Sequence, residues 1–224
     1  MNTFFHPSSI PILFENDDII AVNKPEGLAS IPEHAREKEC LFSLLSAVVS
    51  GKLYVVHRLD KEASGVIVFA KNAAAHRNLN EQFNSREIKK TYIVLTHGVI
   101  NDNRGIIKKP LRQFGSGRVS VDTKNGKTST TEFEVIKRFS AFTLINVYPV
   151  SGRRHQIRAH LYNIGHPIVG DLRYGDKKVQ QRFTRLMLHA QKITCQLPSG
   201  EQVTVKAPIP KSFKAIVDMI SCCE

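Results

Sequence analysis

The sequence has no tryptophan, few cysteines and no long apolar run. Its four cysteines, at positions 40, 195, 222 and 223, form neither a C-x-x-C pair nor the spacing of a zinc site, which favours reduced thiols. The first basic residue is Lys24, so the charged start of a signal peptide is absent. No apolar stretch reaches the roughly 20 residues that a membrane-spanning helix needs. We therefore expect a soluble, cytoplasmic protein with no membrane partner.

Acidic residues are scarce: 20 Asp and Glu stand against 32 Lys and Arg, a net charge of +12. Residues 1–56 carry 4 basic and 7 acidic side chains, so residues 57–224 carry 28 and 13, a net charge of +15. Such an excess suits a polyanion, because each phosphate that is neutralised releases a counterion. An anionic membrane surface is the less specific alternative. A hydrophobic content of 42% over 224 residues excludes disorder for most of the chain.

The order of apolar runs predicts the fold class. Short β-rich runs are predicted as strands over 10–14, 19–23, 53–59, 66–70, 91–99, 129–135, 143–150, 187–194 and 202–206. Helices are predicted over 73–86, with Asn72 as N-cap, after Gly152, and over 211–220. This pattern indicates an α+β fold, a mainly antiparallel mixed sheet with flanking helices, in a single domain of residues 1–224.

The stretch His57-Arg-Leu-Asp-Lys-Glu-Ala-Ser-Gly65 places many charges between two predicted strands. An ordinary turn that uses Asp60 and Gly65 is one interpretation. A hydrolase that uses Ser64 with His57 and Asp60 is another, but no G-x-S-x-G sequence surrounds Ser64. A closer match decides between these interpretations.

The His-Arg-Leu-Asp sequence, followed by Ser-Gly and an apolar strand, resembles the catalytic signature of the RluA branch of the RNA pseudouridine synthases. Further blocks resemble this family in the same order: 22–28, 89–92, 152–158, 165–171 and 188–190. Ala63 departs from the family pattern, which usually has Thr there, and this affects a local hydrogen bond rather than the chemistry. Many relatives begin with an S4 RNA-binding domain, and we expect none here because the first block starts at Val22.

The family reaction isomerises uridine: the bond from ribose C1′ to uracil N1 breaks, and C5 then bonds to C1′. The resemblance implies that Asp60 is the catalytic carboxylate, either as a nucleophile or as a base toward the sugar. It implies Arg158 as the ion-pair partner that favours the charged carboxylate. The less specific interpretation of Arg158 is a solvated charge on a helix that also carries Arg154.

The resemblance also implies the residues that hold the base. Tyr92 would stack on the target uracil, although a core tyrosine in a strand is the common alternative. Arg58 would fill the gap left when the base is flipped out of an RNA stack. Leu188 would form an apolar wall against the base, and a core leucine explains it equally well. His57, beside Arg58, is included among the expected substrate-binding residues.

Several basic residues lie between two predicted strands, in the Gly-containing stretch 104–118, which we expect to be a loop. Lys108, Lys109 and Arg112 in this stretch, together with Arg154, are candidates for contacts to an RNA backbone. The expected partner is structured ribosomal or transfer RNA, read in loops where bases are accessible.

The family reaction needs no cofactor, and we expect none. Nine histidines raise the question of a metal, but His155 and His160 are five residues apart and no H-E-x-x-H occurs, so no metal site is predicted. The alternative function is a non-catalytic RNA-binding module of the same fold. It is disfavoured because a carboxylate in a phosphate-binding cleft repels the ligand. We expect a monomer.

Overall fold

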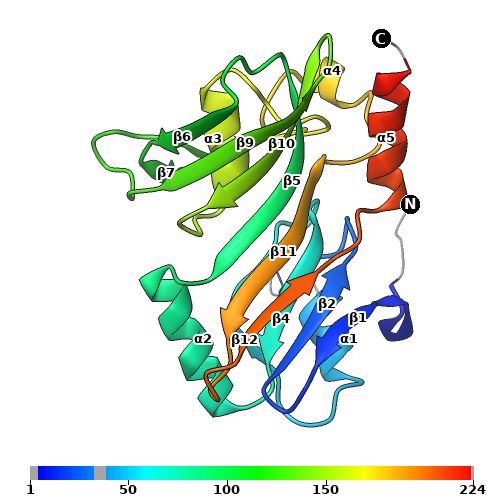
Figure 1. Cartoon of the computed structure of the whole chain (residues 1–224), viewed down its shortest axis with the longest axis vertical. Helices are drawn as coiled ribbons and strands as arrows, with labels where there is room; N and C mark the ends of the chain where they lie inside the picture. The colour runs from blue at the N-terminus through cyan, green and yellow to red at the C-terminus, as the bar shows by residue number, and fades with distance from the viewer. Residues whose placement is uncertain (1–4, 33–38, 223–224) are drawn as a thin grey trace. The chain divides into compact units, whose positions relative to one another are not determined.

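The computed structural model describes residues 5–32 and 39–222. The chain forms two compact units: unit 1 comprises residues 1–90 and 190–208, and unit 2 comprises residues 91–189 and 209–224. Strands β5 (Lys89–His97) and β11 (Leu188–Gln196) each contribute residues to both units (Figure 1). Because neither unit is one continuous segment, no single break in the chain separates them. The single domain over residues 1–224 stays a prediction.

In its described residues, unit 1 contains a sheet, two α-helices and a short 3₁₀ helix, η1. Its elements are η1 (Pro7–Ser9), β1 (Ile12–Glu15), β2 (Ile19–Lys24), α1 (Leu41–Ser46), β3 (Tyr54–Val55), β4 (Ser64–Ala70), α2 (Ala73–Ser85) and β12 (Gln202–Lys206). The strand order is β1-β2-β4-β11, with β3 paired to β4 and β12 paired to β11. The pairs β1–β2, β2–β4, β3–β4 and β11–β12 are antiparallel.

The two central strands of unit 1 form its core. Every side chain of β4 is buried, and so are five of the six in β2. Burial on both faces explains why these strands read as continuous apolar runs rather than as alternating patterns. Helix α2 is capped by the Asn72 side chain, which accepts from the Ala75 N–H at 2.8 Å, and it ends at Arg86 in a left-handed conformation (φ 65°). The predicted helix over 73–86 is confirmed.

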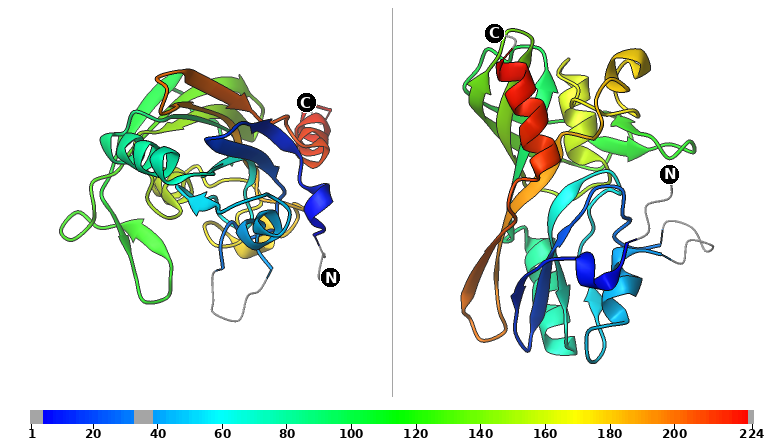
Figure 2. Two further views of the ribbon diagram at one scale, coloured as in Figure 1. Left: turned by 90° about the horizontal axis from the view of Figure 1, so that it is seen from below. Right: turned by 90° about the vertical axis from the view of Figure 1, so that its right-hand side faces the viewer.

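The described part of unit 2 contains a second group of antiparallel strands and three helices. Besides β5 its elements are β6 (Arg104–Lys108), β7 (Leu111–Gln113), β8 (Val119–Val121), β9 (Thr130–Arg138), β10 (Phe142–Pro149), α3 (Gln156–Asn163), α4 (Lys177–Gln180) and α5 (Lys211–Ser221). The order is β5-β10-β9-β6, while β7 and β8 form a separate two-stranded sheet. Helix α3 packs against β8, β9 and β10. The β7–β8 hairpin, residues 111–121, projects from its unit as the green hairpin in Figure 2.

The α+β class with a mostly antiparallel sheet is confirmed, but three details of the prediction are wrong. The strand predicted over 53–59 is only Tyr54–Val55. The stretch 104–118, expected to be a loop, contains β6 and β7, because Ile107 and Leu111 are buried among charged neighbours that hid the pattern. Arg154 precedes α3, which begins at Gln156. In the described ranges, no helix is long and apolar enough to cross a membrane.

Helix α1 was missed because its N-terminal signal is weak. Its N-cap is Cys40, whose thiol accepts from the Ser43 N–H at 3.4 Å, and Ser43 Oγ in turn accepts from the Cys40 N–H at 3.0 Å. Cysteine is not among the residues that ordinarily mark a helix start.

Candidate active site

The turn that carries Asp60 begins where strand β3 leaves strand β4. Tyr54 and Val55 pair with Ala70 and Phe69, and the next N–H of β4, that of Val68, donates to Nε2 of His57 at 3.0 Å. The imidazole therefore replaces a backbone acceptor of the ladder. Because a side chain closes this hydrogen bond, the backbone is released from the sheet at His57. This is the physical reason that the predicted strand 53–59 stops early.

His57 is held in its neutral form. Burial, together with the Lys90 cation, lowers the pKa of His57 from 6.5 to about 3. Its ring lies 5.0 Å from that of Phe83, and Lys90 Nζ lies 5.9 Å from the Phe83 ring centroid. A neutral ring is required, because Nε2 accepts a hydrogen bond only when it carries no proton. Burial also lowers the pKa of Lys90, to about 8.

Two buried polar side chains fix the backbone on both sides of Asp60. Ser30 Oγ accepts from the Leu59 N–H at 3.0 Å and donates to the Leu59 carbonyl at 2.8 Å. Lys24, which is 0% exposed, donates to the Lys61 carbonyl at 3.1 Å and to the Leu28 carbonyl at 2.7 Å. A buried ammonium is costly unless it is hydrogen-bonded, so these contacts account for its position. The turn around Asp60 is thus a fixed part of unit 1.

Sequence reasoning missed Lys24 and Ser30. Lys24 stood only within a block of family resemblance, and its apolar neighbours in β2 gave no sign that its ammonium binds backbone carbonyls. Gly27, with a φ of 84°, completes this contact, since its N–H donates to the Lys61 carbonyl at 2.9 Å. A lysine placed directly before a Pro-x-Gly turn was the available signal.

The predicted site residues of unit 1 differ in exposure. Arg58 is exposed and Asp60 is partly exposed, whereas Ser64 and Ala63 are each 1% exposed. Ser64 is the first residue of β4, inside the sheet, and the Nε2 atom of His57 is engaged with Val68. These positions disfavour a hydrolase built on Ser64, because its hydroxyl is closed to solvent.

Unit 2 holds the other predicted site residues, Tyr92, Arg158 and Leu188. Tyr92 lies in β5 opposite Val147 of β10 and is partly exposed. Leu188 begins β11 and is 4% exposed. Its burial fits an apolar wall and a core leucine alike. Arg158 projects from α3 and is 2% exposed.

Arg158 forms a two-pronged ion pair within unit 2. Its Nε donates to Asp171 Oδ2 and its Nη2 to Asp171 Oδ1, each at 2.8 Å. The side chains are 3% and 0% exposed, so the pair is desolvated. Two parallel bonds fix the plane of the guanidinium as well as its position. Sequence reasoning did not single out Asp171, although it belongs to the Gly165–Asp171 block.

Tyr174 links this ion pair to the β7–β8 hairpin. Asp171 Oδ1 also accepts from the Tyr174 N–H at 3.1 Å, and the Arg158 guanidinium lies 5.4 Å from the Tyr174 ring centroid. The Tyr174 hydroxyl accepts from the Val119 N–H of the hairpin at 3.0 Å. Burial, as the largest cause, raises the pKa of Tyr174, so its phenol stays neutral. Tyr174 therefore contacts both the hairpin, through its hydroxyl, and Arg158, through its ring.

Helix α3 carries further buried polar groups. The Gln156 amide donates to the Thr130 carbonyl at 2.9 Å and accepts from Ser151 Oγ at 2.7 Å. His160 contacts Thr131 Oγ1 and the Lys109 carbonyl, and burial lowers its pKa. These contacts tie the helix to β9 and to the chain before β7, so Gln156 and His160 have a structural role.

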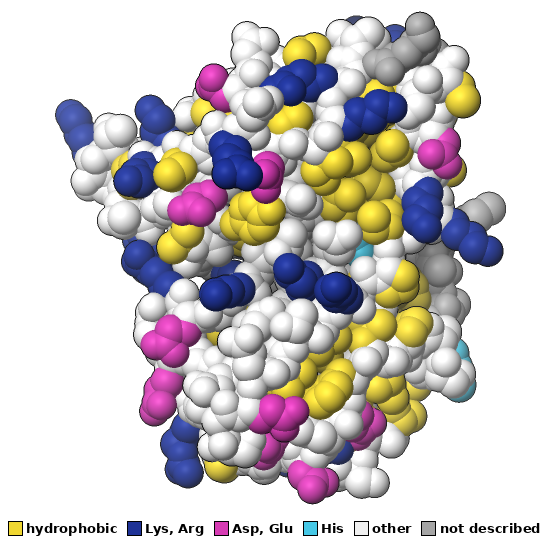
Figure 3. All heavy atoms as spheres, viewed as in Figure 1, with side chains coloured by type: hydrophobic (Ala, Val, Ile, Leu, Met, Phe, Trp, Pro, Cys, Tyr) yellow, Lys and Arg dark blue, Asp and Glu magenta, His cyan; other side chains and the backbone are white. Residues whose placement is uncertain are grey.

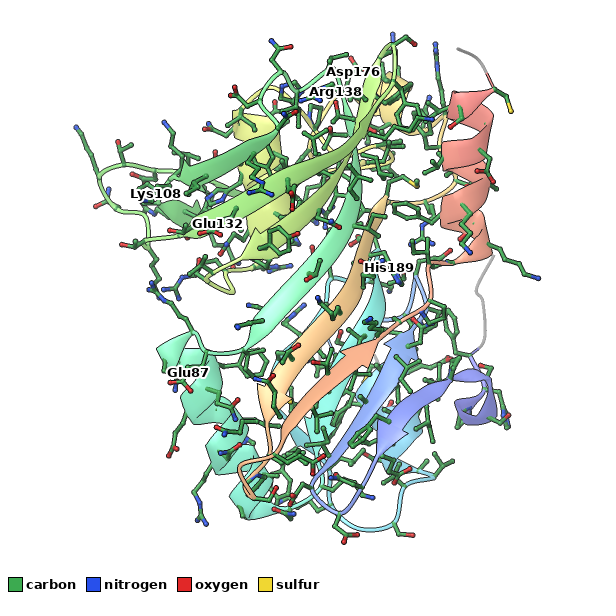
Figure 4. The ribbon with its side chains drawn as sticks, in the orientation of Figure 1. Glu87, Lys108, Glu132, Arg138, Asp176 and His189 are labelled. Atoms are coloured by element: carbon green, nitrogen blue, oxygen red, sulfur yellow. The ribbon has the colours of Figure 1, made fainter. Side chains whose placement is uncertain are left out.

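The predicted backbone-binding residues of unit 2 are all exposed: Lys108, Lys109, Arg112 and Arg154. Lys108 lies at the end of β6 (Figure 4). Arg112 lies in β7 and forms a surface ion pair with Asp122 at 3.2 Å. On the face drawn in Figure 3, Lys and Arg side chains gather at the upper left, over the region of β6 and β7 in Figure 1. The structure thus divides the predicted residues into His57, Arg58 and Asp60 in unit 1 and the rest in unit 2.

No set of three His, Cys, Asp or Glu side chains suited to a metal ion occurs in residues 5–32 and 39–222. Among the predicted site residues, unit 1 supplies a carboxylate and a guanidinium (Asp60, Arg58), and unit 2 supplies a phenol and a guanidinium (Tyr92, Arg158).

Solved structures define the class to which this arrangement belongs. Human RNA Pseudouridylate Synthase Domain Containing 1 matches with a TM-score of 0.80 at 26% identity, covering 98% of this chain and 97% of that chain. Human RNA Pseudouridylate Synthase Domain Containing 4 shares the fold with a TM-score of 0.79 at 23% identity, over 94% and 93%. The fold is that of a pseudouridine synthase.

Sequence comparison gives the family. The model of the RNA pseudouridylate synthase family matches residues 18–163. The chain is 36% identical, over 92% of its length and 69% of the relative, to Ribosomal large subunit pseudouridine synthase C of Buchnera aphidicola. It is 37% identical, over 88% and 92%, to Dual-specificity RNA pseudouridine synthase RluA of Escherichia coli. The chain belongs to the RNA pseudouridylate synthase family and is an isomerase that acts on RNA.

Proposed function

We propose that this isomerase converts particular uridines of structured ribosomal or transfer RNA into pseudouridine, with Asp60 as the catalytic carboxylate. The relatives support this substrate range: one is named for the large ribosomal subunit and another for dual specificity. The observation that carries the proposal is the fixed turn around Asp60. Ser30 clamps Leu59 on one side, and the buried Lys24 binds the Lys61 carbonyl on the other. In an ordinary surface turn, water binds the backbone carbonyls, and no buried ammonium is required.

The proposed reaction balances without an added reagent. The C1′–N1 bond breaks, the uracil leaves as an anion and turns, C5 bonds to C1′, and the C5 proton is exchanged for one on N1. Asp60 acts as a nucleophile at the sugar or as a base toward it. Arg158 supports the ionised carboxylate in this proposal. Within unit 2, Asp171 fixes the guanidinium of Arg158 by accepting from its Nε and Nη2 atoms.

The remaining residues act on the flipped uridine. Arg58 is exposed directly before the clamped Leu59, which suits a side chain that enters an RNA stack when a base leaves it. Tyr92 stacks on the uracil, and Leu188 packs against it. His57 holds the turn through its Nε2 atom, which accepts from the Val68 N–H, and it stays among the proposed substrate-binding residues.

The test is to incubate the protein with bulk RNA from a strain that lacks it and to map new pseudouridines. New pseudouridines in ribosomal or transfer RNA with wild type, and none with Asp60→Asn, support the proposal. Pseudouridines formed only in other RNA classes contradict the substrate range, and turnover by Asp60→Asn contradicts the role of Asp60.

A further inference from the structure

The apolar face of the β7–β8 hairpin is buried, but an aromatic side chain at its tip is exposed. Leu111 and Val119 are each 3% exposed and pack with Ala159 and Tyr174 in one cluster. Phe114, just beyond β7, is 42% exposed. Exposing part of a phenyl ring forfeits part of the free energy of burying it, and Phe114 is not a member of that buried cluster. The ring is therefore available to a partner.

The tip that carries Phe114 is a defined turn. The Phe114 N–H donates to the Arg118 carbonyl at 2.9 Å, and the Gly117 N–H donates to the Phe114 carbonyl at 2.8 Å. Gly117 has a φ of 74°, a conformation that favours glycine. The Arg112 guanidinium lies 5.4 Å from the Phe114 ring centroid, within cation–π distance. Arg112 Nη1 also forms a surface ion pair with Asp122 at 3.2 Å, so Arg112 contacts both Asp122 and the Phe114 ring.

The base of the hairpin is anchored to the rest of unit 2. The Val119 N–H donates to the Tyr174 hydroxyl at 3.0 Å, and Leu111 and Lys127 exchange two backbone hydrogen bonds, at 2.8 and 2.9 Å. The Arg118 guanidinium lies over the rings of Tyr174 and Tyr162, at 5.2 and 5.4 Å. A rigid support lowers the entropic cost when the tip binds a ligand.

The charge around the tip identifies the class of ligand. Lys108, Lys109, Arg112 and Arg118 are all exposed. Cations alone account for contacts to phosphates, but an exposed phenyl ring adds nothing to such a contact. A ring among cations matches the surfaces on which unpaired bases stack while the backbone is held electrostatically.

We propose that Phe114, backed by Arg112, is a stacking platform for an unpaired nucleobase of the substrate RNA, separate from the uridine that reacts. The proposal rests on the proposed function in that RNA is the ligand. It adds a second site at which the enzyme binds the RNA, and this site takes unpaired rather than duplex segments.

The absence of tryptophan from the sequence allows a direct test. Phe114→Trp creates a protein with one indole, whose fluorescence is quenched when a base stacks on it. Ile106→Trp is the matched control, because Ile106 lies in β6 of the same unit and is 59% exposed. Each protein is titrated with single-stranded oligouridylate and, separately, with inorganic polyphosphate of equal total charge.

Quenching of Phe114→Trp by oligouridylate but not by polyphosphate, with Ile106→Trp unchanged, is the expected result. Equal quenching by polyphosphate, equal quenching in the control, or RNA binding without quenching would overturn the proposal. In the otherwise natural chain, Phe114→Leu should weaken oligouridylate binding roughly 5- to 150-fold, which corresponds to about 1–3 kcal/mol for one stacked base. The slope of log K against log salt should stay the same, because no phosphate contact is removed.

The two proposals fail separately. Asp60→Asn combined with Phe114→Trp should still be quenched by oligouridylate, because stacking at the hairpin requires no chemistry at Asp60. Pseudouridine formation without quenching overturns the platform alone. Quenching in a protein that forms no pseudouridine in ribosomal or transfer RNA overturns the proposed function alone.

Discussion

The turn around Asp60 in unit 1 and helix α3 in unit 2 fix their functional residues in opposite ways. In unit 1 the side chains of Ser30, Lys24 and His57 bind main-chain groups, so the backbone is fixed while Arg58 stays exposed. In unit 2 the head group of Arg158 is held by another side chain, that of Asp171. In unit 1 the position of the backbone is fixed, and the exposed side chain can still change its rotamer. In unit 2 the position of the charged group itself is fixed.

This difference predicts different responses to mutation. Removing one of these three side chains of unit 1 leaves neutral backbone groups without a hydrogen bond. The free-energy cost is that of burying an unpaired polar group. Removing Asp171 leaves a buried guanidinium with its charge poorly compensated, which costs more. Unit 1 should therefore tolerate the loss of one contact better than unit 2.

The largest effect on activity is expected for a substitution of Asp60. Asp60→Asn should lower kcat by about 10²–10⁴-fold or more, because an amide is neither a base nor a competent nucleophile. Thermal unfolding should stay close to that of wild type, since the partly exposed side chain is not a core group. Single-turnover pseudouridine formation measures the loss, and wild-type rates in the variant would contradict it.

The largest effect on stability is expected in unit 2. Asp171→Asn keeps the shape of the side chain but removes its charge, and it should lower the free energy of unfolding by about 3–5 kcal/mol, as for a broken buried pair. Asp176→Asn is the matched control, because Asp176 caps α4 on the surface and Asn caps a helix about as well. Urea unfolding measures both, and equal midpoints would show that Arg158 does not depend on Asp171.

The fold class could be predicted because its signals are local. Burial on both faces explains the apolar runs 19–22 of β2 and 66–70 of β4, and Asn72 marks the start of α2. The identity of the turn came from a fixed spacing of residues, His57 to Gly65, which resembles a known family.

The supports of the site could not be predicted because their partners are distant in the chain. Ser30 contacts Leu59 across 29 positions, and Tyr174 contacts Val119 across 55. Ser30 binds backbone atoms, which every residue possesses, so the sequence gives no sign of the pairing. The same reason hid the early end of the strand at His57, whose ring imitates a backbone acceptor.

The clamp on Leu59 gives a smaller expected effect. Ser30→Ala removes two buried hydrogen bonds and should lower the free energy of unfolding by about 1–3 kcal/mol. It should also lower kcat by roughly 10- to 100-fold with little change in KM, because the backbone before Asp60 shifts while RNA contacts remain. Ser85→Ala is the control, an exposed serine whose hydroxyl also bonds a backbone carbonyl. A change in KM alone would assign Ser30 to RNA binding instead.

An effect that appears only below neutral pH is a pH dependence that originates at His57. In the unfolded chain His57 takes up a proton near pH 6.5, whereas in the folded protein its pKa is about 3, because of burial and the Lys90 cation. Between these values the unfolded state binds more protons, so stability falls as the pH is lowered, with a slope of at most about 1.4 kcal/mol per pH unit. His57→Gln retains an acceptor for the Val68 N–H but has no titrating group. Its stability should lie within about 1 kcal/mol of wild type at pH 7.5, and the wild type should lose stability faster than the variant from pH 6.5 to pH 4.5. Urea midpoints across this range measure the difference, and parallel curves would show that His57 is not held neutral by its place in the fold.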